Sequence, residues 1–336
     1  MSLNTLEEIA SYIVSDGKGI LAADESNPTC TKRFDTIGVE STEESRRDYR
    51  EMLFRSSGIQ GNIGGVILFD ETIRQNAKDG TSLVDLMNSQ GALPGIKVDK
   101  GLQPIGDSDE TVTVGLEGLD ERLQEYSLLG AKFTKWRAVI KIGNNLPTDN
   151  CIDANMKALA DYAKVVQDNG MVPMVEPEVL MEGDHSIEEC FAASERSLKS
   201  LFHHLKENGV NIKGTILKPN MVTSGSTCSN QASIDEVAQQ TLECLKANVP
   251  SELPAITFLS GGQSELLATA HLDAMNKIGG FDWKLSFSFG RALQAPTLKA
   301  WMGKPENIFI AQDALSHRAK MNQLAALGQW DKGLED

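Results

Sequence analysis

VPMVEPEVL, residues 172–180, is a near-continuous apolar run that carries two carboxylates. Such runs are typical of strands that are covered on both faces, as in parallel sheets. Just before it, Met156, Leu159 and Ala163 recur at helical spacing, and Gly170 follows as a helix stop. The segment therefore predicts a helix followed at once by a buried strand, which is the repeating unit of a parallel α/β fold.

The same alternation extends from this segment in both directions along the chain. We predict strands at residues 19–25, 64–70, 93–98, 133–142, 171–179, 214–220, 255–262 and 284–290. Helical patterns separate most of them, and Ser41 with Glu44 predicts a capping box before one of these helices. No GxGxxG or GxxxxGK[ST] motif supports a doubly wound nucleotide-binding sheet. Eight strands without a linker predict one (β/α)8 TIM barrel, a single domain over residues 1–336.

Charge and composition narrow the class of partner. The chain has 32 basic and 47 acidic residues, a net charge of −15, which opposes nucleic-acid phosphates. No apolar run reaches the roughly 18 residues of a membrane span, and residues 1–10 lack the basic and apolar regions of a signal peptide. We expect no nucleic-acid or membrane partner and a cytoplasmic location, with the plastid stroma after transit-peptide removal as the alternative.

Cysteine and histidine usage gives no sign of a bound cofactor. Five cysteines without a CxxC pair are typical of free thiols in a reducing compartment. Five histidines show no HExxH or comparable spacing, although scattered ligands can still meet in a fold. We predict no metal and no cofactor.

Polar side chains occupy the carboxyl ends of the predicted strands. In a (β/α)8 barrel these ends meet at the active-site mouth, so unrelated segments deliver their side chains to one place. The residues concerned are Asp24, Glu25, Lys97, Lys135, Arg137, Glu176, Glu178, Lys218, Ser260 and Arg291. One such charge is ordinarily a solvated strand end or an ion pair, but their recurrence on nearly every strand predicts a catalytic site.

The chemistry of these groups suggests a covalent mechanism. Burial of Lys218 in an apolar strand disfavours its ammonium form, and a neighbouring cation such as Lys135 acts in the same direction. A neutral amine is the species that attacks a ketone, after which the iminium allows a nearby bond to break. Glu176 suits the accompanying proton transfers, and Asp24 suits removal of a hydroxyl proton.

Two glycine-containing segments predict an anion site. SGG at residues 260–262 and FGR at residues 289–291 let backbone N–H groups approach a ligand closely, and Arg291 adds a charged fork. The last two loops of a (β/α)8 barrel commonly bind phosphate. The residues alone do not identify the substrate.

Long motifs in this chain resemble class I fructose-1,6-bisphosphate aldolase. They occur in order from about residue 6 to about residue 328: GKGILAADES (17–26), GGVILFDET (64–72), GIKVDKG (95–101), AKFTKWRAVIKIG (131–143), VPMVEPEVL (172–180), ILKPNMV (216–222), FLSGGQSE (258–265) and FSFGRALQ (287–294). The resemblance implies a lyase that cleaves fructose 1,6-bisphosphate reversibly to dihydroxyacetone phosphate and glyceraldehyde 3-phosphate, in glycolysis and gluconeogenesis. It also implies a homotetramer.

The resemblance also implies a role for each matching residue. Lys218 is the Schiff-base nucleophile, Glu176 the acid–base, Lys135 a cation near the reacting carbons and Asp24 the group that handles the C4 hydroxyl proton. The ketose C1 phosphate is expected on Ser260, Gly261, Gly262, Gly290 and Arg291, and the other phosphate towards Lys97, Arg137 and Ser26. Glu178 is expected to support Lys218 and Glu176 electrostatically.

The C-terminus departs from the family pattern. Members typically end in a flexible tail whose last residue is tyrosine, which assists proton exchange at the enamine. This chain ends in GQWDKGLED and has no tyrosine after Tyr162. We expect a short or absent tail, with carbon–carbon cleavage retained and enamine protonation slower than in tailed enzymes.

Three alternative interpretations remain open from the sequence. A Schiff-base transaldolase would transfer a three-carbon unit to an acceptor aldehyde instead of releasing it. A metal-dependent aldolase would be inhibited by a chelator. A scaffolding role for other proteins, in addition to catalysis, is compatible with the sequence, which retains Lys218, Glu176, Lys135 and Asp24.

Overall fold

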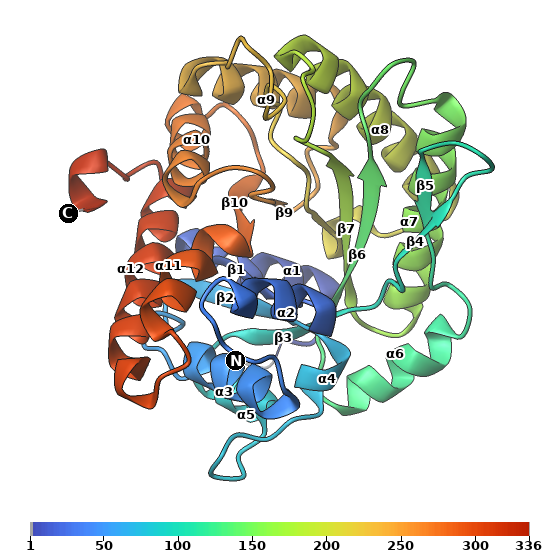
Figure 1. The fold of residues 1–336 in the computed structure, drawn as a ribbon. Coiled ribbons are helices and arrows are strands. Elements are labelled where there is room, and N and C mark those ends of the chain that lie inside the picture. Colours follow the sequence, from blue (N-terminus) through green and yellow to red (C-terminus); the bar gives the residue numbers. More distant parts are fainter. Residues whose placement is uncertain (1–2, 336) are drawn as a thin grey trace.

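A closed barrel of eight parallel strands forms the centre of the molecule in the computed structural model, which describes residues 3–335 (Figure 1). Around the barrel the strands follow the order β1-β10-β9-β8-β7-β6-β3-β2. Their bounds are β1 (Gly19–Ala23), β2 (Ile63–Leu68), β3 (Leu93–Lys97), β6 (Phe133–Ile140), β7 (Val172–Val179), β8 (Ile216–Leu217), β9 (Ala255–Phe258) and β10 (Lys284–Phe289). All eight predicted strands are present, and the (β/α)8 prediction is confirmed. Residues 1, 2 and 336 of the predicted domain lie outside the described residues.

Helices surround this barrel (Figure 1). They are α1 (Leu6–Ile13), α2 (Asn27–Asp35), α3 (Glu43–Phe54), α4 (Asp70–Ile73), α5 (Leu83–Ser89), α6 (Leu119–Leu128), α7 (Asp149–Asp168), α8 (Ile187–Glu207), α9 (Ile234–Asn248), α10 (Glu265–Ile278), α11 (Arg291–Trp301) and α12 (Ile308–Ala326). None of the helices in the described part of the chain has the length and apolar character to cross a membrane.

The start of α3 differs from the prediction by one residue. Thr42 is the N-cap and forms the capping box with Ser45, so the box predicted at Ser41 and Glu44 is wrong. The hydroxyl and carbonyl of Ser41 instead accept hydrogen bonds from the guanidinium of Arg46. Ser41 therefore bonds to Arg46 and does not cap the helix.

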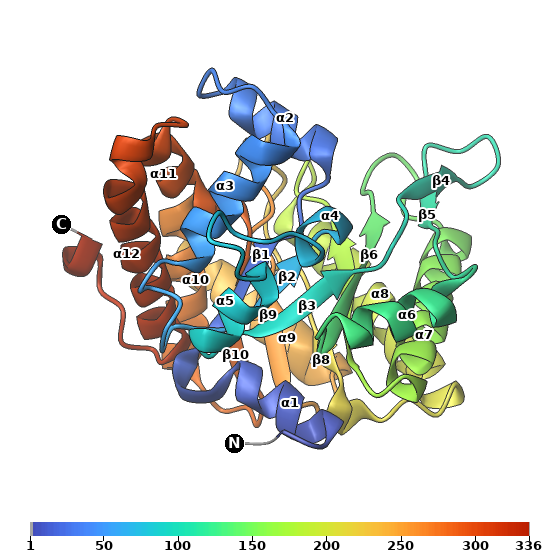
Figure 2. The ribbon, with the colours of Figure 1, turned by 90° about the horizontal axis from the view of Figure 1, so that it is seen from below.

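A small antiparallel hairpin that we did not predict follows β3. It consists of β4 (Leu102–Pro104) and β5 (Thr111–Thr113), and it lies at the same end of the barrel as α2 (Figure 2). The buried carboxylate of Glu110 accepts hydrogen bonds from the N–H and hydroxyl of Thr148, the N-cap of α7. Strands of three residues give too short an alternation to be recognised from sequence.

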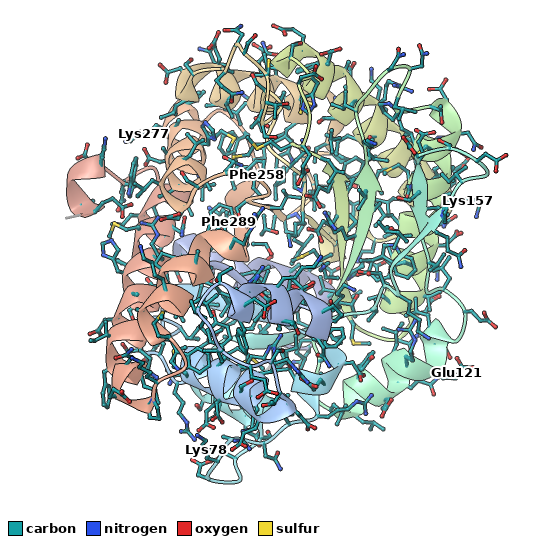
Figure 3. All side chains as sticks on the ribbon, in the orientation of Figure 1. Lys78, Glu121, Lys157, Phe258, Lys277 and Phe289 are labelled. Carbon is teal, nitrogen blue, oxygen red and sulfur yellow. The ribbon has the colours of Figure 1, made fainter. Side chains whose placement is uncertain are left out.

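Two apolar layers stabilise the barrel. One lies between strands and helices and includes Phe258 and Phe289, whereas charged side chains such as Lys157 lie at the periphery (Figure 3). The other fills the barrel interior below the site and includes Phe133. Helix α1 closes that lower end, opposite α2 (Figure 2), and contributes Ile13 to the inner layer.

Candidate active site

A cavity of about 380 Å³ opens at the carboxyl ends of the barrel strands. Of the predicted site residues, all except Gly262 line it: Asp24, Ser26, Lys97, Lys135, Arg137, Glu176, Glu178, Lys218, Ser260, Gly261, Gly290 and Arg291. They come from β3, β6 and β7 and from the segments that follow β1, β8, β9 and β10. The parallel strands end at one rim of the barrel, which explains why residues far apart in sequence converge.

Four alternating charges form a chain across the floor of this cavity. The Nζ of Lys218 lies 3.0 Å from one carboxylate oxygen of Glu176, and the Nζ of Lys135 lies 3.4 Å from the other. Lys135 also lies 2.7 Å from the carboxylate of Asp24. The three residues Lys135, Glu176 and Lys218 are each only 4% exposed. Glu176 thus lies between the two lysines, so Lys135 acts on Lys218 across a carboxylate.

Burial and the neighbouring charges act against each other on these groups. Burial alone would raise the pKa of Asp24, but the ammonium groups of Lys135 and Lys218 prevail and hold it at about 2. The same two cations lower the pKa of Glu176 against the effect of burial. Burial alone would lower the pKa of Lys135, but the carboxylates of Asp24 and Glu176 raise it. Both carboxylates are therefore ionised at neutral pH.

Two further ion pairs lie beside this row of four charges. Arg137 on β6 pairs with Glu178 on β7, and Lys97 on β3 lies 2.8 Å from the carboxylate of Asp99. Burial would lower the pKa of Arg137, but the carboxylate of Glu178 raises it. Glu178 thus neutralises Arg137, and the charges of these cations at the cavity wall are partly compensated before any ligand binds.

Backbone N–H groups and cations meet at the rim near α11. Helix α11 begins at Arg291, and its N-cap is Gly290, which has no side chain to cap the first helix N–H groups. A Cβ on Gly290 would lie 3.5 Å from the carbonyl of Ala22 and 3.8 Å from Arg33. The N-terminus of a helix that faces a cavity with an arginine beside it suits a phosphate group.

Gly262 is not among the residues that line this cavity, and its place in the phosphate site stays a prediction. It has a φ of +77°, and a Cβ there would lie 2.6 Å from the sulfur of Met181. Gly261, by contrast, lines the cavity, and a Cβ there would lie 2.9 Å from the carboxylate of Glu178. The second glycine serves the turn and the close approach of Met181, and the first faces the ligand space.

Four charged or hydroxyl residues that were not among the predicted site residues also line the cavity: Glu25, Thr29, Arg33 and Asp99. Ser26, Thr29 and Arg33 are spaced by three and four residues, which places them on one face of α2. Arg33 pairs with Glu25, which also accepts a 2.8 Å hydrogen bond from Gln294 on α11. Helical spacing after Ser26 was the signal that would have identified Thr29 and Arg33.

No cluster of three or more His, Cys, Asp or Glu side chains within residues 3–335 is arranged to hold a metal ion. The groups that converge are instead amines, carboxylates and guanidiniums. A buried lysine that contacts a carboxylate at the mouth of a (β/α)8 barrel defines a class of barrel enzymes equipped for lysine Schiff-base chemistry.

Comparison with known proteins identifies the family within this class. The family model described as "Glycolytic: Fructose-bisphosphate aldolase class-I" matches residues 5–336. A "Probable fructose-bisphosphate aldolase class 1" of Xanthomonas axonopodis pv. citri is 53% identical over 98% of this chain and 99% of its own length. "Fructose-bisphosphate aldolase 4, cytosolic" of Arabidopsis thaliana is 50% identical over 95% of this chain and 82% of its own. The chain belongs to the class I fructose-bisphosphate aldolase family.

A solved structure supports the same conclusion. Fructose-bisphosphate aldolase of Plasmodium falciparum, in a complex with TRAP and a small-molecule inhibitor, superimposes with a TM-score of 0.96 at 46% identity. The match covers 98% of this chain and 95% of that one. The resemblance inferred from the motifs is thereby confirmed, and the transaldolase interpretation is not supported.

Proposed function

We propose that this chain cleaves fructose 1,6-bisphosphate reversibly to dihydroxyacetone phosphate and glyceraldehyde 3-phosphate through a Schiff base on Lys218. The observation that carries this proposal is the 3.0 Å contact between the Nζ of Lys218 and the carboxylate of Glu176 inside a cavity bordered by arginines and lysines. The names of the family and of its members supply the substrate.

Formation of the Schiff base uses the pair Lys218 and Glu176. The carboxylate of Glu176 accepts a proton from the Lys218 ammonium at 3.0 Å, which frees the amine to attack the ketone carbon. One proton of the attacking amine passes to the ketone oxygen, which gives the neutral carbinolamine. Protonated Glu176 then gives its proton to the carbinolamine hydroxyl, which leaves as water as the C=N bond forms. Lys135 stays cationic beside Glu176 and favours its return to the ionised state.

Cleavage uses the carboxylate of Asp24. With its pKa held at about 2, Asp24 is ionised at neutral pH and accepts the proton of the C4 hydroxyl. The C4 oxygen forms the aldehyde carbonyl, and the electron pair of the C3–C4 bond moves to the iminium to give an enamine. Lys135, 2.7 Å from Asp24, stabilises the charge that develops on the C4 oxygen. Protonation of the enamine and hydrolysis then release dihydroxyacetone phosphate.

The two phosphates bind to two different groups of residues in the cavity. The C1 phosphate binds where Ser260, Gly261, Gly290 and Arg291 meet at the start of α11. The other phosphate binds towards Lys97, Arg137 and Ser26, which come from β3, β6 and the start of α2. These local cations and N–H groups hold two anionic groups against the overall charge of −15.

The cellular setting follows from the relatives. The Arabidopsis relative named cytosolic supports a cytoplasmic location, and the glycolytic family name supports a role in glycolysis and gluconeogenesis.

We also propose that residues 1–336 form one barrel domain and that the protein assembles as a homotetramer. Light scattering after size-exclusion chromatography tests the assembly, and a mass close to the 36.5 kDa monomer would contradict it.

Borohydride trapping tests the catalytic proposal. Reduction in the presence of dihydroxyacetone phosphate is expected to inactivate the enzyme and to add a reduced three-carbon phosphate to the peptide that contains Lys218. Lys218→Ala is expected to fold, to form no adduct and to lose about 10⁴-fold or more in kcat. Lys97→Ala is the matched control, which should still form the adduct. An adduct on another lysine, or inhibition by a chelator, would contradict the proposal.

A further inference from the structure

Backbone pairing between β7 and β8 stops beside the two residues that form the Lys218–Glu176 contact. The N–H of Lys218 donates to the carbonyl of Val175 at 2.8 Å, just after the two residues of β8. Pro177 on β7 and Pro219 after β8 come next, and neither has an N–H to donate. Backbone hydrogen bonds therefore cannot extend this ladder past Lys218 in the ordinary pattern.

The side chain of Asn220 bridges the gap that the two prolines leave. Its Oδ1 accepts a 3.0 Å hydrogen bond from the N–H of Val179, the last residue of β7. Its Nδ2 donates to the carbonyl of Met221 at 3.0 Å and to the hydroxyl of Ser194 on α8 at 3.1 Å. Because a backbone N–H only donates and a carbonyl only accepts, these partners fix the orientation of the amide.

This bridge fixes the spacing of the catalytic pair. Glu176 lies between Val175 and Val179, the two residues through which β7 is tied to the segment after β8. Lys218 and Asn220 are the hydrogen-bond partners of Val175 and Val179, respectively. Without the Asn220 bond, the bond from Lys218 to Val175 and the β7–β8 pairing before it would remain, and all of these lie on one side of the Lys218–Glu176 contact.

We propose that Asn220 is a positioning residue for the Schiff-base step, holding Lys218 and Glu176 at the separation that proton transfer needs. The proposal rests on the function proposed above and adds a residue that touches neither substrate phosphate. Displacement of a catalytic group by about 1 Å lowers a rate by about 100-fold. Loss of the Asn220 hydrogen bond should therefore change kcat by a measurable amount. The residues expected to bind phosphate come from other strands and from the segments that follow them, and Asn220 makes no hydrogen bond to any of them.

Asn220→Ala and Asn220→Leu test the proposal. Leucine keeps the branched volume of asparagine among Pro177, Leu198 and Leu245 but forms no hydrogen bond, so it carries the test if the alanine variant does not fold. We expect kcat for fructose bisphosphate to fall by about 10- to 100-fold with KM changed by less than about 3-fold. The rate of borohydride trapping with dihydroxyacetone phosphate should fall by a similar factor.

Ser194→Ala is the matched control, because it removes the tie of Asn220 to α8 and keeps both backbone bonds. It should retain kcat within about 2-fold of the unchanged enzyme. Full kcat and trapping rate in folded Asn220→Leu would overturn the positioning role, as would an equal loss in Ser194→Ala. Neither result would affect the assignment of Lys218, which fails only if Lys218→Ala retains activity or the adduct maps elsewhere.

Discussion

The carboxylate of Asp24 lies 2.7 Å from the Nζ of Lys135, although β1 and β6 are not neighbours in the barrel. The contact therefore spans the mouth and joins two halves of the site that share no backbone pairing. It holds an ammonium and a carboxylate beside the Lys218–Glu176 contact. Consequences follow for both catalysis and stability.

Asp24→Asn should separate cleavage from Schiff-base formation. Because dihydroxyacetone phosphate has no C4 hydroxyl, its trapping on Lys218 by borohydride does not require Asp24. Cleavage of fructose bisphosphate does, and its kcat should fall by about 10²- to 10⁴-fold. A coupled assay and the trapping rate measure the two steps. Equal losses in both would show that Asp24 acts on the whole site and not on the C4 proton.

The stability contribution of Asp24 should depend on pH. Its pKa of about 2 in the folded protein is below the ordinary value of 3.8 because of Lys135 and Lys218. The stabilisation is therefore fully present above pH 4 and is lost as the pH falls from 3.8 through about 2. The difference in free energy of unfolding between the unchanged protein and Asp24→Asn should shrink with falling pH. Urea unfolding at successive pH values measures it, and a constant difference would contradict the account.

Gly261 and Gly262 should give opposite phenotypes when changed to alanine. A Cβ on Gly261 would lie 2.9 Å from the carboxylate of Glu178 and enter the ligand space, so KM should rise by about 10-fold, or about 1.4 kcal/mol. Gly262→Ala should leave KM unchanged and destabilise the fold by about 1–3 kcal/mol, because its φ is +77° and Met181 is 2.6 Å away. Steady-state kinetics and urea unfolding distinguish the two outcomes.

The lower end of the barrel should be sensitive at Gly64. A Cβ there would lie 2.0 Å from the carbonyl oxygen of Ile13, the last residue of α1. Gly64→Ala should therefore displace α1 and lower the free energy of unfolding by about 3 kcal/mol. Gly143→Ala is the control, because its nearest neighbour is Leu146 at 3.7 Å, and a change within about 0.5 kcal/mol is expected. Equal stability of the two variants would show that α1 moves to accommodate the added Cβ without a loss of stability.

Local pattern was enough to predict the barrel. The eight strands are buried apolar runs, and helix ends such as Asn169 after α7 carry the residues that stop helices. These signals depend on neighbours in sequence, so one chain displays them. The β4–β5 hairpin was missed because strands of three residues give too short an alternation, and the cap was misplaced because Ser41 and Thr42 are both residue types that cap helices.

For the site, the sequence determined which side chains stand at strand ends, because the local pattern shows where each strand runs and which residues come at its carboxyl end. Tertiary structure alone decided their partners: Glu176 between two lysines, Arg137 neutralised by Glu178, Gly261 in the cavity lining and Gly262 against Met181. Those contacts depend on distances of a few ångströms between strands that barrel closure brings together. No spacing within the chain encodes such distances, because closure sets them for all eight strands at once.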